Sequence, residues 1–189
     1  NLLKRHNLEV FDVELNDING GSFRTYIKHK DGGQSIKISE GAQQRINNLK
    51  ENEEKLELND KKTYEDFASR VEKIKKEVFN FIKDEVEKGK KVYVYGASTK
   101  GNTLLQYFNL DSSLIGAAAE RNSTKWGRKT VGTNIPIISE EQARAEKPDY
   151  FLILPWHFLK EFKEREVEYL KNGGKFIVPL PEFEIIDKV

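Results

Sequence analysis

The sequence predicts an α/β fold: a mostly parallel sheet with helices on both faces, preceded by a β-hairpin and a long helix. Over residues 90–189, apolar strand-like runs alternate with segments of helical spacing, which is typical of parallel strands joined by right-handed crossovers. At the start of this region, the strand-like run 91–95 ends at Gly96, and a short polar turn leads into residues of helical periodicity. Such turns commonly bind ligands in parallel α/β sheets.

The region before residue 90 predicts two further elements. Residues 8–13 and 23–28 have strand character and flank an Asn-Gly-Gly sequence, which supplies the positive φ angles of a tight hairpin connection. Because an isolated hairpin is marginally stable in water, we expect it to pack on the main domain or on a sheet outside this sequence. Residues 39–60 are polar and predict an exposed helix or a linker. Thr63 then begins a stronger amphipathic helix, which Gly89 ends.

Each later element follows from a local pattern. Short apolar runs mark buried strands, and apolar residues three and four positions apart mark helices. Ser139 and Gln142 form a capping box, and a Gly-Gly pair ends the last helix. The strands are expected at residues 91–95, 114–119, 135–137, 150–154 and 176–178, and the helices at residues 99–108, 139–146 and 159–171.

Composition limits the classes of function. The 32 basic and 31 acidic residues nearly cancel, so no overall field attracts nucleic acid or a membrane surface. The chain has no cysteine for disulfides, thiolate ligands or nucleophiles, and its three histidines are too scattered for a metal cluster. No apolar stretch approaches the roughly 20 residues of a membrane span, and the start lacks a signal peptide. We therefore expect a cytoplasmic protein that binds neither metal, nucleic acid nor membrane. The absence of methionine, even at position 1, predicts a piece of a longer polypeptide.

The turn Gly96-x-Ser98-x-x-Gly101 resembles the dinucleotide fingerprint Gly-x-Gly-x-x-Gly with serine in the middle. Phosphate binding at the start of the following helix, assisted by Lys100, is the functional interpretation. The alternative is a sharp strand-to-helix turn in which the glycines are needed only for the backbone conformation. The sequence lacks the Gly-Lys-Ser/Thr end of a Walker loop, and Lys100 stands where a nucleophile elbow has its second glycine, so Ser98 is not predicted to be a nucleophile.

Charged residues follow the next predicted strand. Glu120 lies 24 residues after Gly96, where a ribose-binding carboxylate sits in dinucleotide folds, and Arg121 can meet a phosphate or the edge of a uracil or thymine base. Solvated strand-end charges are the alternative. The next loop includes Trp126 as a stacking face and fits a nucleotide diphosphate, although a solvated loop is the alternative. Its cations are Lys125, Arg128 and Lys129.

Trp156 and His157 follow another strand end and a proline, so both are expected at the same cleft. Trp156 can stack on a base or a sugar, or lie buried beneath the next helix. His157 can donate to phosphate or act as an acid or base, but the sequence shows no partner for it.

Several motifs occur in order along the chain: Tyr-Gly-Ala-Ser-Thr-Lys-Gly-Asn-Thr-Leu-Leu, Glu-Arg-Asn, Lys-Trp-Gly-Arg, Leu-Pro-Trp-His and Gly-Gly-Lys-Phe-Ile-Val-Pro-Leu-Pro. They occupy residues 95–105, 120–122, 125–128, 154–157 and 173–181, with further motifs at 132–137 and 148–150. Together they resemble the C-terminal domain of the sugar C-methyltransferase family, and the resemblance extends over nearly the whole chain.

The resemblance implies a function. Enzymes of this family act on nucleotide-linked deoxysugars with S-adenosylmethionine: a proton next to a sugar keto group is removed, and the carbanion attacks the donor methyl. Their C-terminal domain is Rossmann-like and helps to hold the nucleotide sugar rather than the methyl donor. The substrate-binding residues are then expected to be Gly96, Ser98, Thr99, Lys100, Gly101, Asn102, Glu120, Arg121, Trp156 and His157.

The resemblance also implies a division of the chain. Residues 1–38 are expected to be a hairpin remnant of an upstream methyltransferase domain, residues 39–89 a helical connector, and residues 90–189 the Rossmann-like C-terminal domain. A zinc-binding domain and the S-adenosylmethionine domain would precede them in the same polypeptide. We therefore expect this chain alone to bind no cofactor, to bind a nucleotide diphosphate weakly, and to be inactive.

Family members commonly carry His-Gly-Gly-Ser at the hairpin turn, with the histidine as candidate base. This chain has Asn19 there, and neutral asparagine cannot take up a proton at neutral pH, so no catalytic base is assigned. Two other classes remain open. One is an NAD(P)- or nucleotide-binding Rossmann module, either an oxidoreductase or a sensor, in which Glu120 binds ribose. The other is a degenerate domain that serves interaction only.

Overall fold

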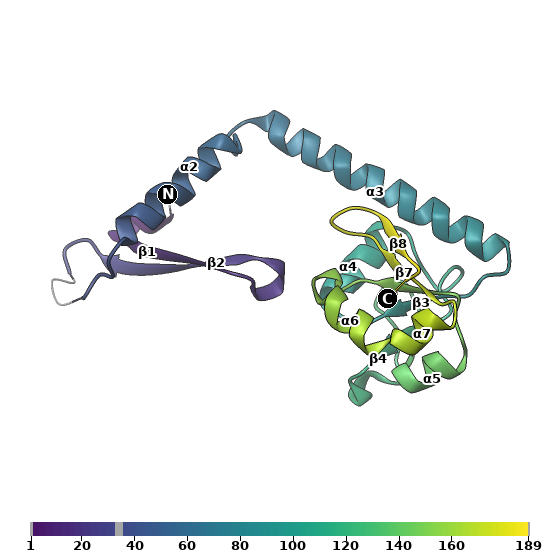
Figure 1. The fold of residues 1–189 in the computed structure, drawn as a ribbon. Helices are drawn as coiled ribbons and strands as arrows, with labels where there is room; N and C mark the ends of the chain where they lie inside the picture. The colour runs from purple at the N-terminus through teal and green to yellow at the C-terminus, as the bar shows by residue number, and fades with distance from the viewer. Residues whose placement is uncertain (1, 33–35, 189) are drawn as a thin grey trace. The chain divides into compact units, whose positions relative to one another are not determined.

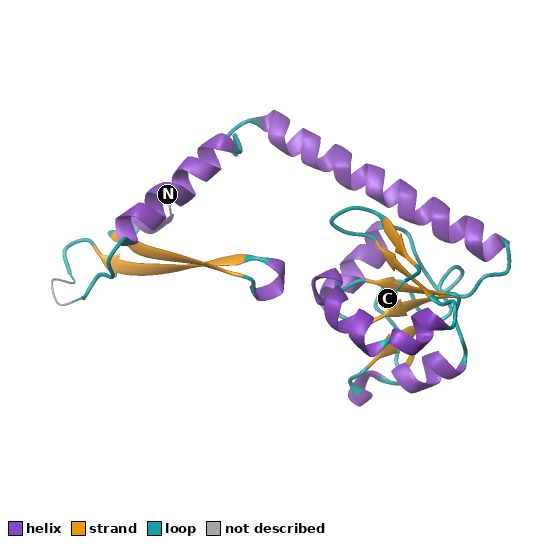
Figure 2. Ribbon diagram, viewed as in Figure 1, coloured by secondary structure: helices purple, strands orange, loops and turns teal. Residues whose placement is uncertain are grey.

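The computed structural model describes residues 2–32 and 36–188, and the side chain of Asn19 lies outside the described part. The chain forms two compact units, Asn1–Phe67 and Ala68–Val189 (Figure 1). The first unit combines a hairpin with a helix, and the second is a sheet flanked by helices (Figure 2).

The first unit is built on an antiparallel β-hairpin, which confirms the prediction. Strand β1 (Leu8–Asn16) pairs with β2 (Ser22–His29), and both strands are longer than the predicted runs. Gly20 and Gly21 in the connection have φ angles of 87° and 121°, which favour glycine. The other elements of this unit are α1 (Leu2–Arg5), η1 (Ile18–Gly20) in the turn, and α2 (Ala42–Lys55).

An ion pair fastens α2 to the hairpin. Arg45 on α2 donates from Nε to Asp12 Oδ1 at 2.9 Å and from Nη2 to Asp12 Oδ2 at 2.7 Å. The Ser39 hydroxyl donates to the same carboxylate at 2.6 Å. Asp12 is only 6% exposed, and the hydrogen bonds from Arg45 and then Ser39 lower its pKa to about 2.

The hairpin also leaves apolar side chains exposed. Leu15 and Phe23 face each other across the two strands and are 71% and 59% exposed, and Ile18 and Ile27 are exposed as well. Burial of apolar surface is favourable by about 25 cal/mol per Å². The hairpin therefore retains apolar surface that packing against a further element would stabilise.

The second unit contains a six-stranded sheet in the order β5-β4-β3-β6-β7-β8. Neighbouring strands are parallel except for β7 and β8, which are antiparallel. The strands are β3 (Val92–Tyr95), β4 (Ala118–Glu120), β5 (Ile137–Ser139), β6 (Tyr150–Ile153), β7 (Lys175–Val178) and β8 (Glu184–Ile186). The helices are α3 (Lys61–Glu87, which begins within the first unit), α4 (Thr99–Tyr107), α5 (Glu140–Ala145), α6 (Leu159–Arg165) and α7 (Val167–Lys171), with η2 (Ser123–Lys125) and η3 (Trp156–Phe158) between them.

Side chains of β3 alternate between two buried layers, because successive residues of a strand point to opposite faces. Val92 and Val94 pack in one cluster with residues of α3 and α4, whereas Tyr93 and Tyr95 pack in the other with residues of α5, α6 and α7. Helices therefore cover both faces of the sheet, which confirms the predicted α/β architecture.

Two predicted helix boundaries are wrong. Helix α3 begins at Lys61, because Asp60 Oδ1 accepts the Lys62 amide at 2.8 Å, whereas the Thr63 hydroxyl donates to the Glu57 carbonyl at 3.0 Å instead of capping the helix. The single helix expected over residues 159–171 is broken at Glu166 into α6 and α7.

Two predicted strands are displaced along the sequence. The amides of Leu114 and Ile115 both bond to the Asp111 carbonyl in a turn, so these two residues lie outside the strand, and β4 covers Ala118–Glu120. Strand β5 begins at Ile137 because Ile135 pairs with Thr130, whose amide donates to the Ile135 carbonyl at 2.9 Å. The antiparallel strand β8 was not predicted.

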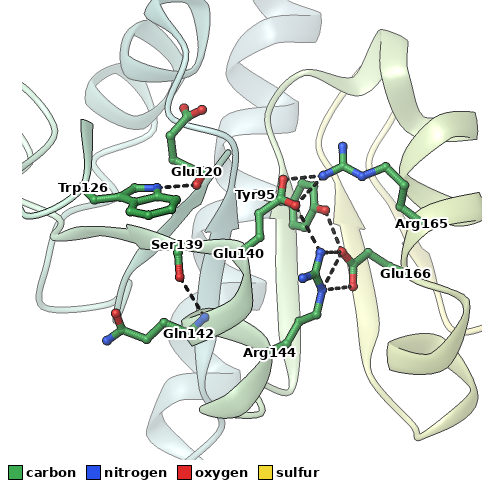
Figure 3. A network of polar contacts seen from close by, with 9 residues as sticks. All are labelled: Tyr95, Glu120, Trp126, Ser139, Glu140, Gln142, Arg144, Arg165 and Glu166. Atoms are coloured by element: carbon green, nitrogen blue, oxygen red, sulfur yellow. Dashed lines mark hydrogen bonds and ion pairs between the residues drawn. The ribbon is translucent and has the colours of Figure 1, made fainter. Parts of the chain in front are cut away.

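The break between α6 and α7 places Glu166 inside the protein (Figure 3). Glu166 is 2% exposed and accepts hydrogen bonds from Tyr95 Oη and from Arg144 Nη2, each at 2.7 Å. Arg144 also reaches Glu140 on its own helix at 3.1 Å. Burial, followed by the contact with Glu166, raises the pKa of Tyr95, so its hydroxyl stays protonated and acts as a donor. The network joins the end of β3 to α5 and to the helix break.

The Asp12–Arg45 pair predicts an acid-sensitive first unit. Because the folded pKa of Asp12, about 2, lies below its ordinary value of 3.8, the ionised carboxylate stabilises the fold above about pH 4. This stabilisation is lost as the pH falls from about 4 towards 2. Thermal unfolding followed by circular dichroism should show a steeper loss of Tm over this window for the parent than for Asp12→Asn. Glu51→Gln, on the exposed side of α2, should keep the parent's slope; equal slopes for the parent and Asp12→Asn would contradict the prediction.

Removal of the Glu166 carboxylate should destabilise the second unit. In Glu166→Ala the buried Tyr95 hydroxyl loses its acceptor and Arg144 loses a partner, which we expect to cost about 3 kcal/mol. Glu168→Ala is the control, since that side chain is 80% exposed and pairs only with Lys171 among the described residues; it should change stability by less than about 0.5 kcal/mol. Urea unfolding measures both, and a cost below about 1 kcal/mol for Glu166→Ala would refute the role of the network.

Candidate functional site

The candidate site lies where the strand order reverses, between β3 and β6. In open parallel sheets, ligands bind at the carboxyl ends of the strands at this point. The turn that follows β3 and the segment that follows β6 touch each other. A Cβ atom on Gly96, whose φ is +89°, would lie 3.2 Å from Pro155 Cγ. Glycine is therefore favoured at position 96 by both its backbone conformation and this contact.

The turn after β3 is shaped by its own packing. Ser98 caps α4, since its side-chain oxygen accepts a hydrogen bond from the Gly101 amide at 3.0 Å. A Cβ atom on Gly101 would lie 2.9 Å from Leu154 Cδ1 and 3.2 Å from Leu154 Cβ. Helix α4 thus approaches the end of β6 too closely for a side chain. The outer glycines and the serine of the motif all have a structural role that is independent of any ligand.

The first turn of α4 faces solvent. Thr99 and Lys100 are exposed, and Asn102 is half-buried. The start of a helix carries partial positive charge, to which the Lys100 ammonium adds. This turn therefore offers an environment that favours an anionic group.

Glu120, the last residue of β4, ties the neighbouring segments together. Its Oε2 accepts the Ala97 amide at 3.0 Å and forms an ion pair with Lys125 Nζ at 3.1 Å, while its Oε1 accepts the Asn122 amide at 2.9 Å. Lys125 Nζ also donates to the Ala97 carbonyl at 2.9 Å. The carboxylate and the ammonium together lock the 122–126 loop onto the turn that follows β3.

These donors keep Glu120 ionised. The side chain is 12% exposed, and this burial opposes ionisation, but the hydrogen bonds from Asn122, Lys125 and Ala97 outweigh it and lower the pKa of Glu120. Both carboxylate oxygens already accept hydrogen bonds from the protein. Glu120 therefore orders the site from within, at the position where a dinucleotide fold uses a carboxylate to bind ribose.

Arg121 and Trp126 directly follow Glu120 and Lys125, the two residues of this ion pair. Arg121 follows β4 directly and is exposed. Trp126 donates its indole N–H to the Glu120 carbonyl at 2.7 Å, and its side chain is 45% exposed (Figure 3). The loop thus presents a guanidinium group and an aromatic ring to solvent beside the anchored turn.

Trp156 and His157 lie in the segment that follows β6. Trp156 is half-buried and packs against the core cluster of Tyr93 and Tyr95. The His157 ring packs against Phe158 with ring centroids 4.3 Å apart. Its Nδ1 atom is buried and has no hydrogen-bond partner in the described part of the chain.

The structure brings most of the predicted site residues to one edge of the sheet. Contacts through Ala97, Pro155 and Leu154 connect Gly96, Gly101 and Glu120. Asn19 belongs to the first unit, and its side chain lies outside the described residues. The bridging role of Lys125 was missed, because a contact across an irregular loop leaves no periodic signal in the sequence.

The described residues hold neither a metal-binding cluster nor a membrane-spanning helix. Residues 2–32 and 36–188 contain no group of three or more histidine, cysteine, aspartate or glutamate side chains suited to a metal ion. In the same ranges, every helix is too short or too polar to cross a membrane.

Comparison with known proteins gave two matches. The model of the C-methyltransferase C-terminal domain family matches residues 17–181. The C-methyltransferase NovU of Streptomyces niveus is 33% identical over 185 residues, which cover 98% of this chain and 43% of NovU. The chain therefore spans less than half the length of this relative.

Neutralising Glu120 should release the 122–126 loop. In Glu120→Gln, one side-chain oxygen becomes an NH₂ group that cannot accept from Ala97, Asn122 or Lys125, which we expect to cost about 2 kcal/mol. Trp126 should then become more accessible to acrylamide quenching. Glu182→Gln, in an exposed loop, should leave both stability and quenching unchanged. If Glu120→Gln had the same stability and quenching as this control, the contacts of Glu120 would not hold the 122–126 loop in place.

Proposed function

The chain belongs to the C-methyltransferase C-terminal domain family, and we propose that it is the substrate-binding part of an enzyme that transfers a methyl group from S-adenosylmethionine to a carbon of a nucleotide-activated deoxysugar. The substrate class, the donor and the activity of the whole protein are all part of this proposal, because the chain covers 43% of its relative NovU.

One observation carries the proposal: a turn suited to an anion stands beside exposed cations at the switch point of the sheet. Thr99 and Lys100 are exposed on the first turn of α4, and Arg121 is exposed at the end of the adjacent strand β4. A helix start combined with lysine and arginine favours phosphate oxygens. The diphosphate of a nucleotide-linked sugar is the ligand group that suits this edge.

The same turn is less suited to the adenosyl group of the methyl donor than to a diphosphate. In dinucleotide folds, the acidic residue at the end of the second strand accepts hydrogen bonds from ribose hydroxyls. Here Glu120 occupies that position, and its oxygens accept hydrogen bonds from Ala97, Asn122 and Lys125. We therefore place the donor on another part of the polypeptide. The same observation disfavours an NAD-binding module, which would need this carboxylate for its own ligand.

Catalytic roles are left unassigned in this proposal. Asn19 stands at the position of the family's candidate base and cannot take up a proton at neutral pH. His157 is assigned to binding, because it lies in the segment that follows β6, at the same edge of the sheet as the turn after β3. This chain's residues thus bind and orient the substrate.

Ligand binding tests the proposal. Calorimetric titration of the chain should show binding of uridine or thymidine diphosphate, with NAD at least about tenfold weaker because Glu120 is engaged. Lys100→Ala and Arg121→Ala should each weaken diphosphate binding about five- to tenfold through the loss of a charge-assisted contact. The control is Lys73→Ala, whose side chain is 75% exposed on α3 and should have no effect.

Three results would contradict the proposal: tighter binding of NAD than of the diphosphates, no binding of any nucleotide, or identical affinities for Lys100→Ala, Arg121→Ala and the control. Methyl transfer from S-adenosylmethionine by this chain alone would contradict the placement of the donor elsewhere. A radiolabelled donor with a keto sugar nucleotide as acceptor would detect it.

A further inference from the structure

Trp126 is fixed in position yet keeps a large exposed surface. Its indole N–H donates to the Glu120 carbonyl at 2.7 Å, and its amide donates to the Ser123 carbonyl at 3.2 Å. The side chain is nevertheless 45% exposed. Because the only polar atom of the ring is satisfied within the protein, the surface that remains exposed is aromatic carbon. Such a surface is suited to stacking against another planar ring.

A hollow of about 250 Å³ lies beside this ring. It is lined by residues 126–129, residues 136–139 and Gln142. The two walls are fixed to each other by backbone hydrogen bonds: the Gly127 amide donates to the Ile137 carbonyl at 2.9 Å, and the Ile137 amide donates to the Arg128 carbonyl at 2.8 Å. The hollow is therefore preformed. Pockets for drug-sized ligands start at about 300 Å³, so this one suits a single ring system.

The lining of the hollow carries positive charge. Arg128 and Lys129 both contribute to it, and no carboxylate does. Across the described residues, neither side chain forms an ion pair or a hydrogen bond. Arginine and lysine are donors without acceptor capacity, so they suit a ring that bears carbonyl oxygens better than one that bears amino groups.

Trp156 lacks these properties. It is half-buried against the core cluster that contains Tyr93 and Tyr95, and its ring lies nearly perpendicular to that of His157 with centroids 5.8 Å apart. Trp126, by contrast, lines the hollow that contains Arg128 and Lys129.

We propose that Trp126, Arg128 and Lys129 form the subsite for the base of the substrate nucleotide. The base is a pyrimidine with two carbonyl oxygens, which stacks on Trp126 while the two cations donate to its oxygens. Glu120 and Lys125 connect this subsite to the turn where we propose that the diphosphate binds. The inference rests on the proposed function and deepens it, because it assigns recognition of the base to Trp126 and the two cations beside it.

Intrinsic fluorescence can test this directly, because the chain has two tryptophans. In Trp156→Phe, Trp126 is the sole tryptophan, and uridine diphosphate should quench its emission about twofold or more through stacking. In Trp126→Phe, Trp156 is the sole tryptophan, and its emission should stay nearly constant. The first variant leaves Trp126 and its anchor to Glu120 intact, so the reporter is the residue under test.

Affinity gives an independent readout. Trp126→Ala should weaken uridine diphosphate binding about tenfold to a hundredfold, whereas Trp126→Tyr, which keeps a stacking ring, should stay within about threefold of the parent. Cytidine diphosphate, with an amino group in place of one carbonyl oxygen, should bind more weakly than uridine diphosphate, and Arg128→Gln should reduce this difference.

The possible outcomes separate the two proposals. Calorimetric binding of uridine diphosphate without quenching of Trp126, or with equal affinity for Trp126→Ala, would overturn the base subsite and leave the proposed function standing. Absence of any nucleotide binding would overturn the proposed function, and the base subsite with it. Quenching of Trp126 together with weaker binding by Trp126→Ala would establish the subsite.

Discussion

The carboxylate of Glu120 is the contact on which the arrangement of the candidate site depends. It joins the turn after β3, the end of β4 and the 122–126 loop through Ala97, Asn122 and Lys125. A carboxylate that is 12% exposed would be costly without partners, and the three donors make its ionised form the stable one. Because this lock is internal to the protein, the turn and the ring of Trp126 keep one arrangement before any ligand arrives, which reduces the ordering cost of binding.

The buried carboxylate of Glu166 holds β3 from the face of the sheet that α5, α6 and α7 cover. Tyr95 directly precedes Gly96, and its hydroxyl donates to Glu166 between the helices of that face. Buried ion pairs seldom add much net stability, because desolvation offsets their attraction. The network of Glu166, Arg144 and Tyr95 is therefore better understood as setting the docking position of α5 and of the break between α6 and α7. A shift of these helices would leave a buried hydroxyl or carboxylate unpaired.

The sequence allowed the fold class to be predicted because its signals are local. Alternating apolar runs, the Asn-Gly-Gly turn and the glycine after β3 each act over a few residues. The errors arose where distant partners decide. Strand β5 begins at Ile137 because Ile135 pairs with Thr130, and the helical pattern of residues 159–171 breaks at Glu166, whose carboxylate accepts hydrogen bonds from the distant Tyr95 and Arg144. In the candidate site, the positions of Gly96, Ser98 and Glu120 at one edge of the sheet could be predicted from spacing, whereas the bridge from Lys125 to Ala97 depends on the folded loop.

A topology that elsewhere binds dinucleotides can hold a different ligand when its acidic residue is engaged internally. The order of the parallel strands and the turn after β3 create an anion-binding edge in any such sheet. What changes here is the end of β4, where Glu120 bonds to its own loop and so exposes Arg121 and Trp126 at its flanks. On the proposed function, selectivity then rests on groups that donate hydrogen bonds or stack rather than on a carboxylate that accepts from ribose. Such groups favour phosphate oxygens and planar, carbonyl-rich bases. On the proposed function, the contacts of one carboxylate separate a substrate site from a cofactor site on the same fold.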